Sequence, residues 1–292
     1  MILPLFILFI LVILFFTFQN ISFKQFNMNY MKNTASYFIF NAIYFTLICV
    51  IYVIIGVNTS FFEPSVIALG SLFAVSFIAA MYFYMKAMEN GPLGLSFLFF
   101  SAGMLVPILF GIIFYNEPAP FHRLIGLILL FIAFSISVWG KSGSKMNKKW
   151  VTYILLGSLS NGVIGVAIKL CRIVISEEAL TEFLFLGFGQ AATISLIIGI
   201  IIIGKYKAKL SHFRGIPFLA VAIMAAVTTA GGNYIMVLLS LSVSALVQFP
   251  VINGSLVITS IITSRMVYKE QVTKQHLLAI LIGLAAIIML SV

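Results

Sequence analysis

Ten long runs of apolar residues divide this chain of 292 residues, and they constrain its fold more than any other feature. Each run is close to the roughly 20 residues that an α-helix needs to cross the hydrocarbon core of a bilayer. The sequence therefore predicts an all-α membrane protein with ten transmembrane helices. We place these helices at Ile2–Phe18, Thr34–Val57, Ser65–Met85, Leu93–Tyr115, Leu124–Trp139, Val151–Cys171, Phe183–Ile203, Ile216–Leu239, Val243–Met266 and Leu277–Val292.

The composition agrees with this class of protein. Hydrophobic residues make up 62% of the chain and charged residues 8%, whereas a soluble domain is about 45–50% apolar and about 25% charged. The formal net charge is +10, but the basic residues lie between apolar runs rather than in one patch. This distribution is typical of membrane loops. We expect a lipid bilayer around the protein and no nucleic-acid partner.

The basic residues also orient the predicted helices. Of the 17 lysines and arginines, 14 lie in connections that follow odd-numbered runs. Positive charge is retained on the cytoplasmic side of a membrane. We therefore expect a multi-pass protein of the plasma (inner) membrane with both termini on the extracytoplasmic side.

The second half of the chain weakly repeats the first at an offset of 153 residues. Tyr115 and Glu117 return as Tyr268 and Glu270, and Leu124 corresponds to Leu277. Because five spans are an odd number, two such halves must have opposite orientations. The sequence predicts two inverted five-helix repeats, at residues 1–140 and 151–292, joined by a basic cytoplasmic linker at residues 141–150. Inverted repeats are typical of secondary transporters.

Short motifs recur in both halves. They comprise a lysine near the end of the first span of each half, a tyrosine in the third, and an acidic residue at the end of the fourth. The residues concerned are Phe18–Lys24, Tyr82, Asn116-Glu117, Asn161 with Lys169, Asn233-Tyr234, Phe249–Gly254 and Lys269-Glu270. This pattern resembles the drug/metabolite transporter superfamily, EamA type, over nearly the whole chain. The resemblance implies ten helices in two repeats around a central cavity, and transport of small organic solutes.

The acidic residues are seven glutamates, all at or near the ends of apolar runs. Intramembrane carboxylates often relay protons or sodium ions, and none is placed near the middle of a span. Glu117 and Glu270 are interpreted as structural acids that cap the N-terminus of the next helix. The alternative is a gate ion pair with Arg123 or Lys274.

Lys24 and Lys169 end equivalent predicted helices in the two halves. One interpretation is that each lysine snorkels, with its alkyl stem in lipid and its ammonium group at the interface. The other makes them paired gate residues.

Polar side chains within the apolar runs are the candidates for substrate contact. An unsatisfied amide in hydrocarbon is costly, so we expect these side chains to face the interior of the bundle, where they bind substrate or a neighbouring helix. Pro250 predicts a break in its helix, and Gly254 permits close approach of the backbone. The predicted substrate-pathway residues are Asn20, Tyr82, Asn161, Asn233, Tyr234, Gln248 and Asn253.

Signals for an enzyme are missing from the sequence. His122, His212 and His276 are isolated in connections without metal-ligand spacing, and no nucleophile elbow or zinc-protease motif is present. We expect no enzyme, metal or cofactor. The predicted function is a secondary transporter that moves a small organic metabolite, of amino acid, nucleobase or amine type, by alternating access. Two alternatives stay open, a flippase for a lipid-linked carrier and a membrane subunit that does not transport.

Overall fold

The structure is a computed structural model, and it describes residues 2–90, 99–138, 148–207, 213, 215–267 and 274–291. Regular structure in this part of the chain is helical throughout, without a strand. The all-α class predicted from the apolar runs is therefore confirmed.

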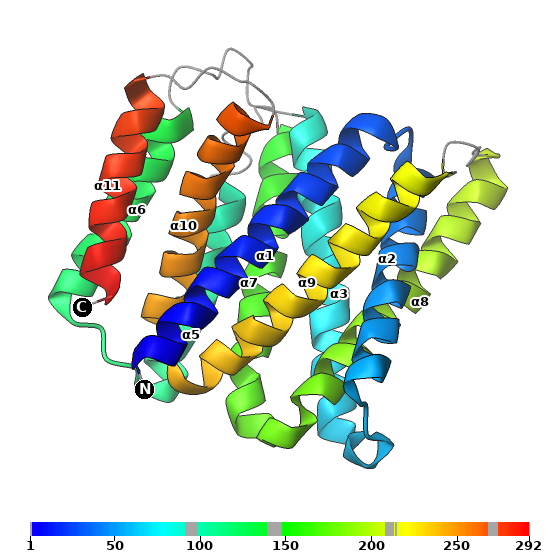
Figure 1. Cartoon of the computed structure of the whole chain (residues 1–292), viewed down its shortest axis with the longest axis horizontal. Helices are drawn as coiled ribbons and strands as arrows, with labels where there is room; N and C mark the ends of the chain where they lie inside the picture. Colours follow the sequence, from blue (N-terminus) through cyan, green and yellow to red (C-terminus); the bar gives the residue numbers. More distant parts are fainter. Residues whose placement is uncertain are drawn as a thin grey trace. The chain divides into compact units, whose positions relative to one another are not determined.

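The α-helices are α1 (Ile2–Asn29), α2 (Thr34–Ile55), α3 (Pro64–Asn90), α5 (Leu105–Tyr115), α6 (Phe121–Val138), α7 (Lys148–Val174), α8 (Leu180–Tyr206), α9 (Ile216–Ser242), α10 (Ala245–Met266) and α11 (Lys274–Ser291). Three short 3-10 segments also occur, η1 at Thr59–Phe61, η2 at Ala102–Met104 and η3 at Glu177–Ala179. Figure 1 shows long helices, and short turns join α1 to α2 and α9 to α10.

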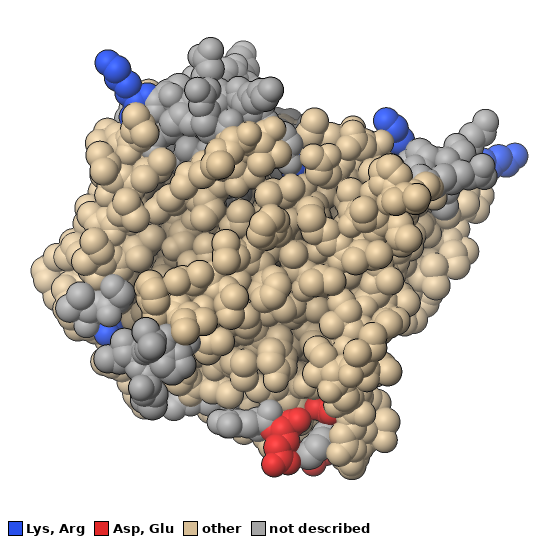
Figure 2. All heavy atoms as spheres, viewed as in Figure 1, with Lys and Arg blue, Asp and Glu red and all other residues tan. Residues whose placement is uncertain are grey.

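Six of the described helices are long and apolar enough to cross a membrane, namely α1, α2, α3, α7, α8 and α9. Shorter apolar helical segments lie at Phe99–Tyr115, Phe121–Ile136, Ala245–Thr259 and Leu277–Leu290. On the face shown in Figure 2, most of the described surface is formed by uncharged residues. The chain thus has the helices and the surface of a membrane protein.

Helix ends differ from the prediction most at α1, and next at the end of α3, which reaches Asn90 instead of Met85. The first helix continues past Phe18 and Lys24 to Asn29, because none of the intervening residues is a helix breaker. It stops before Asn33, whose side chain accepts a hydrogen bond of 2.8 Å from the Ser36 N–H and so caps α2. In the predicted linker, residues 148–150 form the start of α7, and residues 141–147 lie outside the described residues.

The chain forms two compact units. Unit 1 comprises residues 1–78 and 170–238, and unit 2 comprises residues 79–169 and 239–292. The boundaries fall inside α3, α7 and α9, so each unit contains segments from both halves of the sequence. The predicted halves are defined by a repeat along the sequence, whereas the two units are defined by which segments pack together.

An aromatic core fills unit 1. The ring of Phe188, on α8, is fully buried, and its centroid lies 5.6 Å from that of Phe45, 5.3 Å from that of Phe73 and 5.7 Å from that of Phe77. These distances are in the range that aromatic pairs prefer. The rings come from α2, α3 and α8, so one cluster holds these three helices together.

Small residues bring the helices of unit 2 together. A Cβ atom at Gly165, on α7, would lie 2.7 Å from Pro107 of α5, and one at Gly126, on α6, would lie 3.1 Å from the Ala286 carbonyl oxygen of α11. Gly103, in η2, is tighter still, because its Cβ atom would overlap the backbone carbonyl oxygen of Ser158. Close backbone approach of this kind is how membrane helices gain packing energy where lipid offers no hydrophobic drive.

Gly103→Ala is expected to destabilise the protein by about 1–3 kcal/mol, because the new methyl group meets backbone that cannot move aside. The thermal unfolding midpoint of the purified protein in detergent measures this. Gly204→Ala is the matched control, since a Cβ atom there would meet nothing within 4 Å. Equal midpoints for the two variants would contradict the proposed tight contact.

Candidate functional site

A buried polar cluster lies at the middle of α9 in unit 1. Gln19, on α1, donates a hydrogen bond of 2.6 Å from Nε2 to Oγ1 of Thr229. Tyr52, on α2, donates one of 2.9 Å from its hydroxyl to the carbonyl oxygen of Ala230. Asn233 donates one of 2.9 Å from Nδ2 to the carbonyl oxygen of Thr229. Polar side chains of α1, α2 and α9 itself therefore bond to one short segment of α9, and we call this group of residues the α9 cluster.

The α9 cluster is isolated from water and centred in its helix. Thr229 and Tyr52 are 0% exposed and Asn233 is 4% exposed. Thirteen residues of α9 precede Thr229, beginning at Ile216, and thirteen follow it, ending at Ser242. In a helix that crosses a bilayer, this position corresponds to the middle of the membrane.

Two glycines position α1 against the cluster. Cβ atoms at Gly231 and Gly232 would lie 2.7 Å from the ring of Phe15 and 2.5 Å from the ring of Phe16. Since glycine has no side chain, α1 approaches α9 closely here and brings Gln19 within reach of Thr229. The cluster supplies two amides, a hydroxyl and a phenol, groups that can exchange hydrogen bonds with a neutral or zwitterionic ligand.

A buried ion pair forms a second polar centre, in unit 2. Nζ of Lys169, on α7, lies 3.0 Å from Oε1 of Glu117. The same ammonium group donates a hydrogen bond of 2.7 Å to the carbonyl oxygen of Val243, in the turn between α9 and α10. Lys169 is 1% exposed and Glu117 9% exposed. Both charges are therefore held inside the protein.

The local sequence explains how Glu117 reaches this position. Asn116 ends α5 in the left-handed conformation, with φ of 51°, which asparagine tolerates better than most residues. The Glu117 N–H then donates to the carbonyl oxygen of Gly111 at 3.2 Å. Gly111 has room for no side chain, because a Cβ atom there would lie 2.6 Å from Oε2 of Glu117. The carboxylate consequently lies against α5 and points at α10.

Each charge of the ion pair lies at a helix end of opposite partial charge, the ammonium group after α9 and the carboxylate at the start of α10. Oε2 of Glu117 accepts a hydrogen bond of 2.6 Å from the N–H of Ala245, the first residue of α10. A carboxylate is favoured at a helix N-terminus and an ammonium group at carbonyl oxygens beyond a helix C-terminus. Tyr115 adds a hydrogen bond of 2.9 Å from its hydroxyl to the carbonyl oxygen of Lys169. The ion pair thus provides hydrogen-bond partners for the carbonyl oxygen of Val243 and the N–H of Ala245, on the two sides of the α9–α10 turn.

Several predicted residues lie in these two centres. Asn233 belongs to the α9 cluster, and Tyr234 follows it on α9. Glu117 and Lys169 form the ion pair.

The other predicted polar residues of unit 2 lie elsewhere. Asn161 donates to the carbonyl oxygen of Phe100 at 3.4 Å, and Tyr82 packs edge-on against Phe83. Gln248 is fully buried on α10. Asn253 is partly buried and donates to the carbonyl oxygen of Phe249, in its own helix, at 2.8 Å.

Three expectations need correction in detail. Asn20 is exposed, whereas Gln19 beside it is buried. α10 runs unbroken through Pro250, since a proline removes only one backbone donor and neighbouring helices can compensate for it. Gly254 instead makes room for Leu130, which lies 2.8 Å from where its Cβ atom would be.

The charged residues also differ from expectation. Lys169 is buried and does not snorkel, because Glu117 and the Val243 carbonyl hold its ammonium group. Glu117 caps α10 instead of the helix that follows it in the chain. Lys24 is partly buried inside α1, before its last turn, and Glu270 lies outside the described residues.

Gln19, Thr229 and Tyr52 are missing from the predicted set. One signal for Gln19 is present in the sequence, since the buried residues Val12, Gln19, Ser22 and Phe26 follow each other at spacings of seven, three and four, which defines one helix face. The bonds to Thr229 and Ala230 span 210 and 178 residues of sequence. No local sequence pattern indicates contacts between residues so far apart in the chain.

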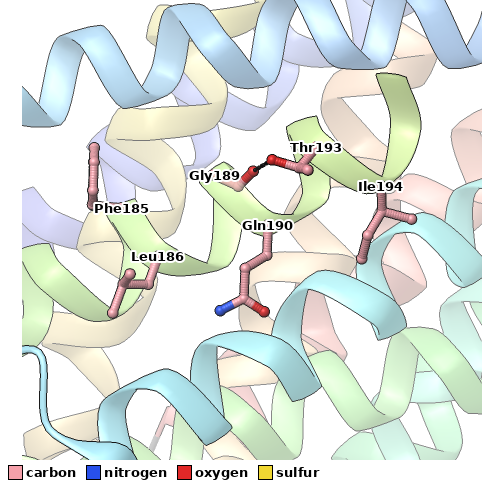
Figure 3. A pocket seen from close by; sticks show the side chains of 6 residues that line it. All are labelled: Phe185, Leu186, Gly189, Gln190, Thr193 and Ile194. Carbon is pink, nitrogen blue, oxygen red and sulfur yellow. Dashed lines mark hydrogen bonds between the residues drawn. The ribbon is translucent and has the colours of Figure 1, made fainter. Parts of the chain in front are cut away.

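An open groove lies along α8 in unit 1, with a volume of about 440 Å³. Figure 3 shows its lining residues, Phe185, Leu186, Gly189, Gln190, Thr193 and Ile194. Thr193 donates its hydroxyl to the carbonyl oxygen of Gly189 within the same helix, at 2.9 Å. The groove contains no titratable group and none of the predicted residues. In the part of the chain that the structure describes, no three His, Cys, Asp or Glu side chains come together to hold a metal ion.

Comparison with known proteins informs the fold. No family model matches the sequence, and no curated protein matches it significantly. Among solved structures 27 chains are similar. One of them, a crystal structure, superposes with a TM-score of 0.77 over 98% of this chain and 96% of that chain, at 13% sequence identity. At this identity the likeness shows a shared fold alone.

Lys169→Met is expected to lower stability by about 3–5 kcal/mol, because it leaves the Glu117 carboxylate buried without its counter-charge. Removing both charges in Lys169→Met with Glu117→Gln should restore part of the loss, since the double variant leaves no lone charge. Thermal unfolding midpoints in detergent measure both effects. Lys205→Met, which removes an exposed lysine at the end of α8, is the control and should change the midpoint little. A double variant less stable than Lys169→Met would contradict this account.

Proposed function

We propose that this protein is a secondary transporter that moves a small organic metabolite across the plasma membrane by alternating access. The observation that carries the proposal is the α9 cluster, in which Gln19, Tyr52 and Asn233 direct polar groups at the middle of an apolar helix. Transporters bind their substrates near the midplane of the bilayer. Polar groups buried at that depth are costly unless they bond each other or a ligand.

The helix pairs support the repeat on which alternating access depends. α6 and α11 pack against each other in unit 2, and their bounds differ by 153 residues at both ends, since 274 − 121 = 153 and 291 − 138 = 153. This is the offset of the sequence repeat. α2 packs with α8 in unit 1 and α5 with α10 in unit 2, which also join corresponding helices of the two halves. We propose ten membrane spans in two inverted five-helix repeats, as in the EamA type of drug/metabolite transporter.

The ion pair of unit 2 fits a gate in this scheme. Glu117 and Lys169 fasten the α9–α10 turn at an end of each helix, and breaking them would release that turn. In the inverted repeat, Lys24 is the counterpart of Lys169 at the opposite end of the pathway. Both termini are then extracytoplasmic, on the basis of the basic connections.

The chemistry of the α9 cluster suggests the substrate class. Its donors and acceptors are an amide, hydroxyls and backbone carbonyl oxygens, without a charged side chain among them. Such groups suit a neutral or zwitterionic solute with its own donors and acceptors. Amino acids and nucleobases are therefore the classes to test first, followed by amines, the third class expected from the sequence. We propose no enzymatic step, cofactor or nucleic-acid partner.

A panel of soluble metabolites is expected to contain a ligand that raises the thermal unfolding midpoint of the purified protein saturably. A ligand at 100 times its dissociation constant adds about 2.7 kcal/mol to the folded state. Asn233→Leu should abolish that shift and the uptake of the same ligand into proteoliposomes. Asn27→Leu, which replaces an exposed amide in the last turn of α1, should leave both unchanged.

The other possible outcomes would each support a different function or a different binding site. A shift with a lipid-linked sugar, and with no soluble metabolite, would replace the proposal with a lipid-carrier flippase. Absence of any shift, together with normal folding and no flux, would favour a subunit that does not transport. A shift that survives in Asn233→Leu would locate binding outside the α9 cluster.

A further inference from the structure

Asn41, on α2, and Ser195, on α8, are buried polar residues of unit 1 that lie outside the α9 cluster. Asn41 is 4% exposed and Ser195 0% exposed. Nδ2 of Asn41 and Oγ of Ser195 are both enclosed, and neither has a hydrogen-bond partner among the residues that the structure describes. Each is therefore a polar group removed from water without a bond in return.

Similar side chains of this protein are satisfied by their own helices. The hydroxyl of Thr193, also on α8, donates to the carbonyl oxygen four residues earlier, and the amide of Asn233 does the same on α9. Asn41 and Ser195 do not form this bond. Their donors are thus available to a partner outside their own helices.

α2 and α8 pack side by side in opposite directions (Figure 1). At one contact, a Cβ atom at Gly199 of α8 would lie 2.7 Å from Cδ1 of Ile39 of α2. Further along α2, Sγ of Cys49 lies 3.7 Å from the carbonyl oxygen of Phe185 of α8. Residue numbers thus rise along α2 as they fall along α8.

These contacts place Asn41 and Ser195 at nearly the same level of the interface. Asn41 follows Ile39 by two residues and Ser195 precedes Gly199 by four, which correspond to about 3 Å and about 6 Å along the respective helices. Both residues also lie within one turn of the middle of their helices. In helices that cross a bilayer, this level corresponds to the middle of the membrane.

Both side chains lie on the faces through which α2 and α8 meet. Along α2, the buried residues Asn41, Phe45 and Tyr52 follow each other at spacings of four and seven residues, which defines one face of a helix. Along α8, Ser195 follows Phe188 by seven residues. The ring centroid of Phe188 lies 5.6 Å from that of Phe45 and 6.4 Å from that of Tyr52. An amide and a hydroxyl therefore share one aromatic interface.

A polar group buried in an apolar interface is costly unless it forms a hydrogen bond. Two such groups at one level can be satisfied together by a single molecule that bonds to both. This molecule must accept a hydrogen bond from Asn41 and exchange one with the hydroxyl of Ser195, which both donates and accepts. Neither side chain carries a charge, so a neutral group suits the site better than an ion, which needs a counter-charge or several ligands.

We propose that Asn41 and Ser195 form a binding site, between α2 and α8, for a small neutral group that carries a hydrogen-bond acceptor and a donor. Two sources supply this chemistry. One is an internal water molecule, which typically bonds to otherwise unsatisfied buried groups. The other is an amide or hydroxyl group of a transported solute, and this source alone rests on the proposed function.

The site is separate from the α9 cluster. Tyr52, the member of that cluster on α2, lies eleven residues from Asn41, or roughly 16 Å along the helix. A solute that passes along this face of α2 would therefore meet two polar positions, with the rings of Phe45 and Phe188 between them.

A double-mutant cycle tests the site without any added solute. Asn41→Leu, Ser195→Ala and the double variant are compared with the wild type by denaturant unfolding of the purified protein in detergent. A shared water molecule makes the two effects non-additive. Each single variant should lower the folding equilibrium constant about fivefold, the usual contribution of one hydrogen bond, and the double variant should also lower it about fivefold instead of about 25-fold.

Thr193→Val is the matched control, because it removes from the same helix a hydroxyl that is exposed and bonded within α8. Combined with Asn41→Leu, it should give additive effects. In a dry interface, Asn41→Leu and Ser195→Ala would instead leave stability unchanged or raise it, because each removes an unbonded polar group from the interior.

Uptake into proteoliposomes identifies a solute as the occupant. Ser195→Ala should then lower the uptake rate about fivefold, while the metabolite still raises the thermal unfolding midpoint through the α9 cluster. Additive effects in the cycle, together with wild-type uptake by Ser195→Ala, would overturn the proposal. Additive effects would also overturn it if the wild-type protein takes up no metabolite, whereas non-additive effects would uphold the site even then.

A high-resolution experimental structure of the wild-type protein covers the case in which the variants do not fold. It should show a water molecule or a solute atom within hydrogen-bond distance of both Nδ2 of Asn41 and Oγ of Ser195. A direct hydrogen bond between the two side chains, or an interface with nothing between them, would refute the proposal.

Discussion

The cost of burying polar groups away from water governs this structure. Hydrocarbon offers no hydrogen bonds, so every polar atom inside an apolar helix bundle must find its partner within the protein. At a few defined points the chain pairs polar groups that come from different helices. In the α9 cluster, side chains of α1 and α2 bond to the middle of α9, and in unit 2 one lysine and one glutamate satisfy both sides of a helix turn. Between such points the helices pack through glycine and aromatic rings.

The two polar centres differ in charge, and we propose that they also differ in role. Lys169 and Glu117 carry opposite full charges and bind to the ends of helices, where their positions are fixed by the helix dipoles. The α9 cluster consists of uncharged amide and hydroxyl groups that bond to each other and to backbone carbonyl oxygens. The first arrangement holds a junction in place, and the second is the place where we propose that substrate binds.

Sequence reasoning predicts the helices here better than their contacts. Apolar runs of about 20 residues are a local property, so the class of fold and most helix positions follow from them. α1 was predicted too short, because Gln19, Asn20 and Lys24 look like the end of a span, whereas tertiary contacts keep Gln19 inside the bundle. The partner of Glu117 lies 52 residues away on α7, since 169 − 117 = 52. Its capped helix starts 128 residues away. Such pairings are set by the three-dimensional packing, which a single sequence does not display.

The depth at which the ion pair is buried also determines how it responds to ionic strength. Mobile salt ions weaken electrostatic attraction between exposed charges, over a screening length of about 8 Å at physiological ionic strength. They cannot enter the space around Lys169, which is 1% exposed. The α9–α10 turn should therefore stay fastened in concentrated salt that screens the exposed Lys205 and Lys207 at the end of α8. Solutions of high ionic strength would then weaken attractions between exposed charges without loosening this internal junction.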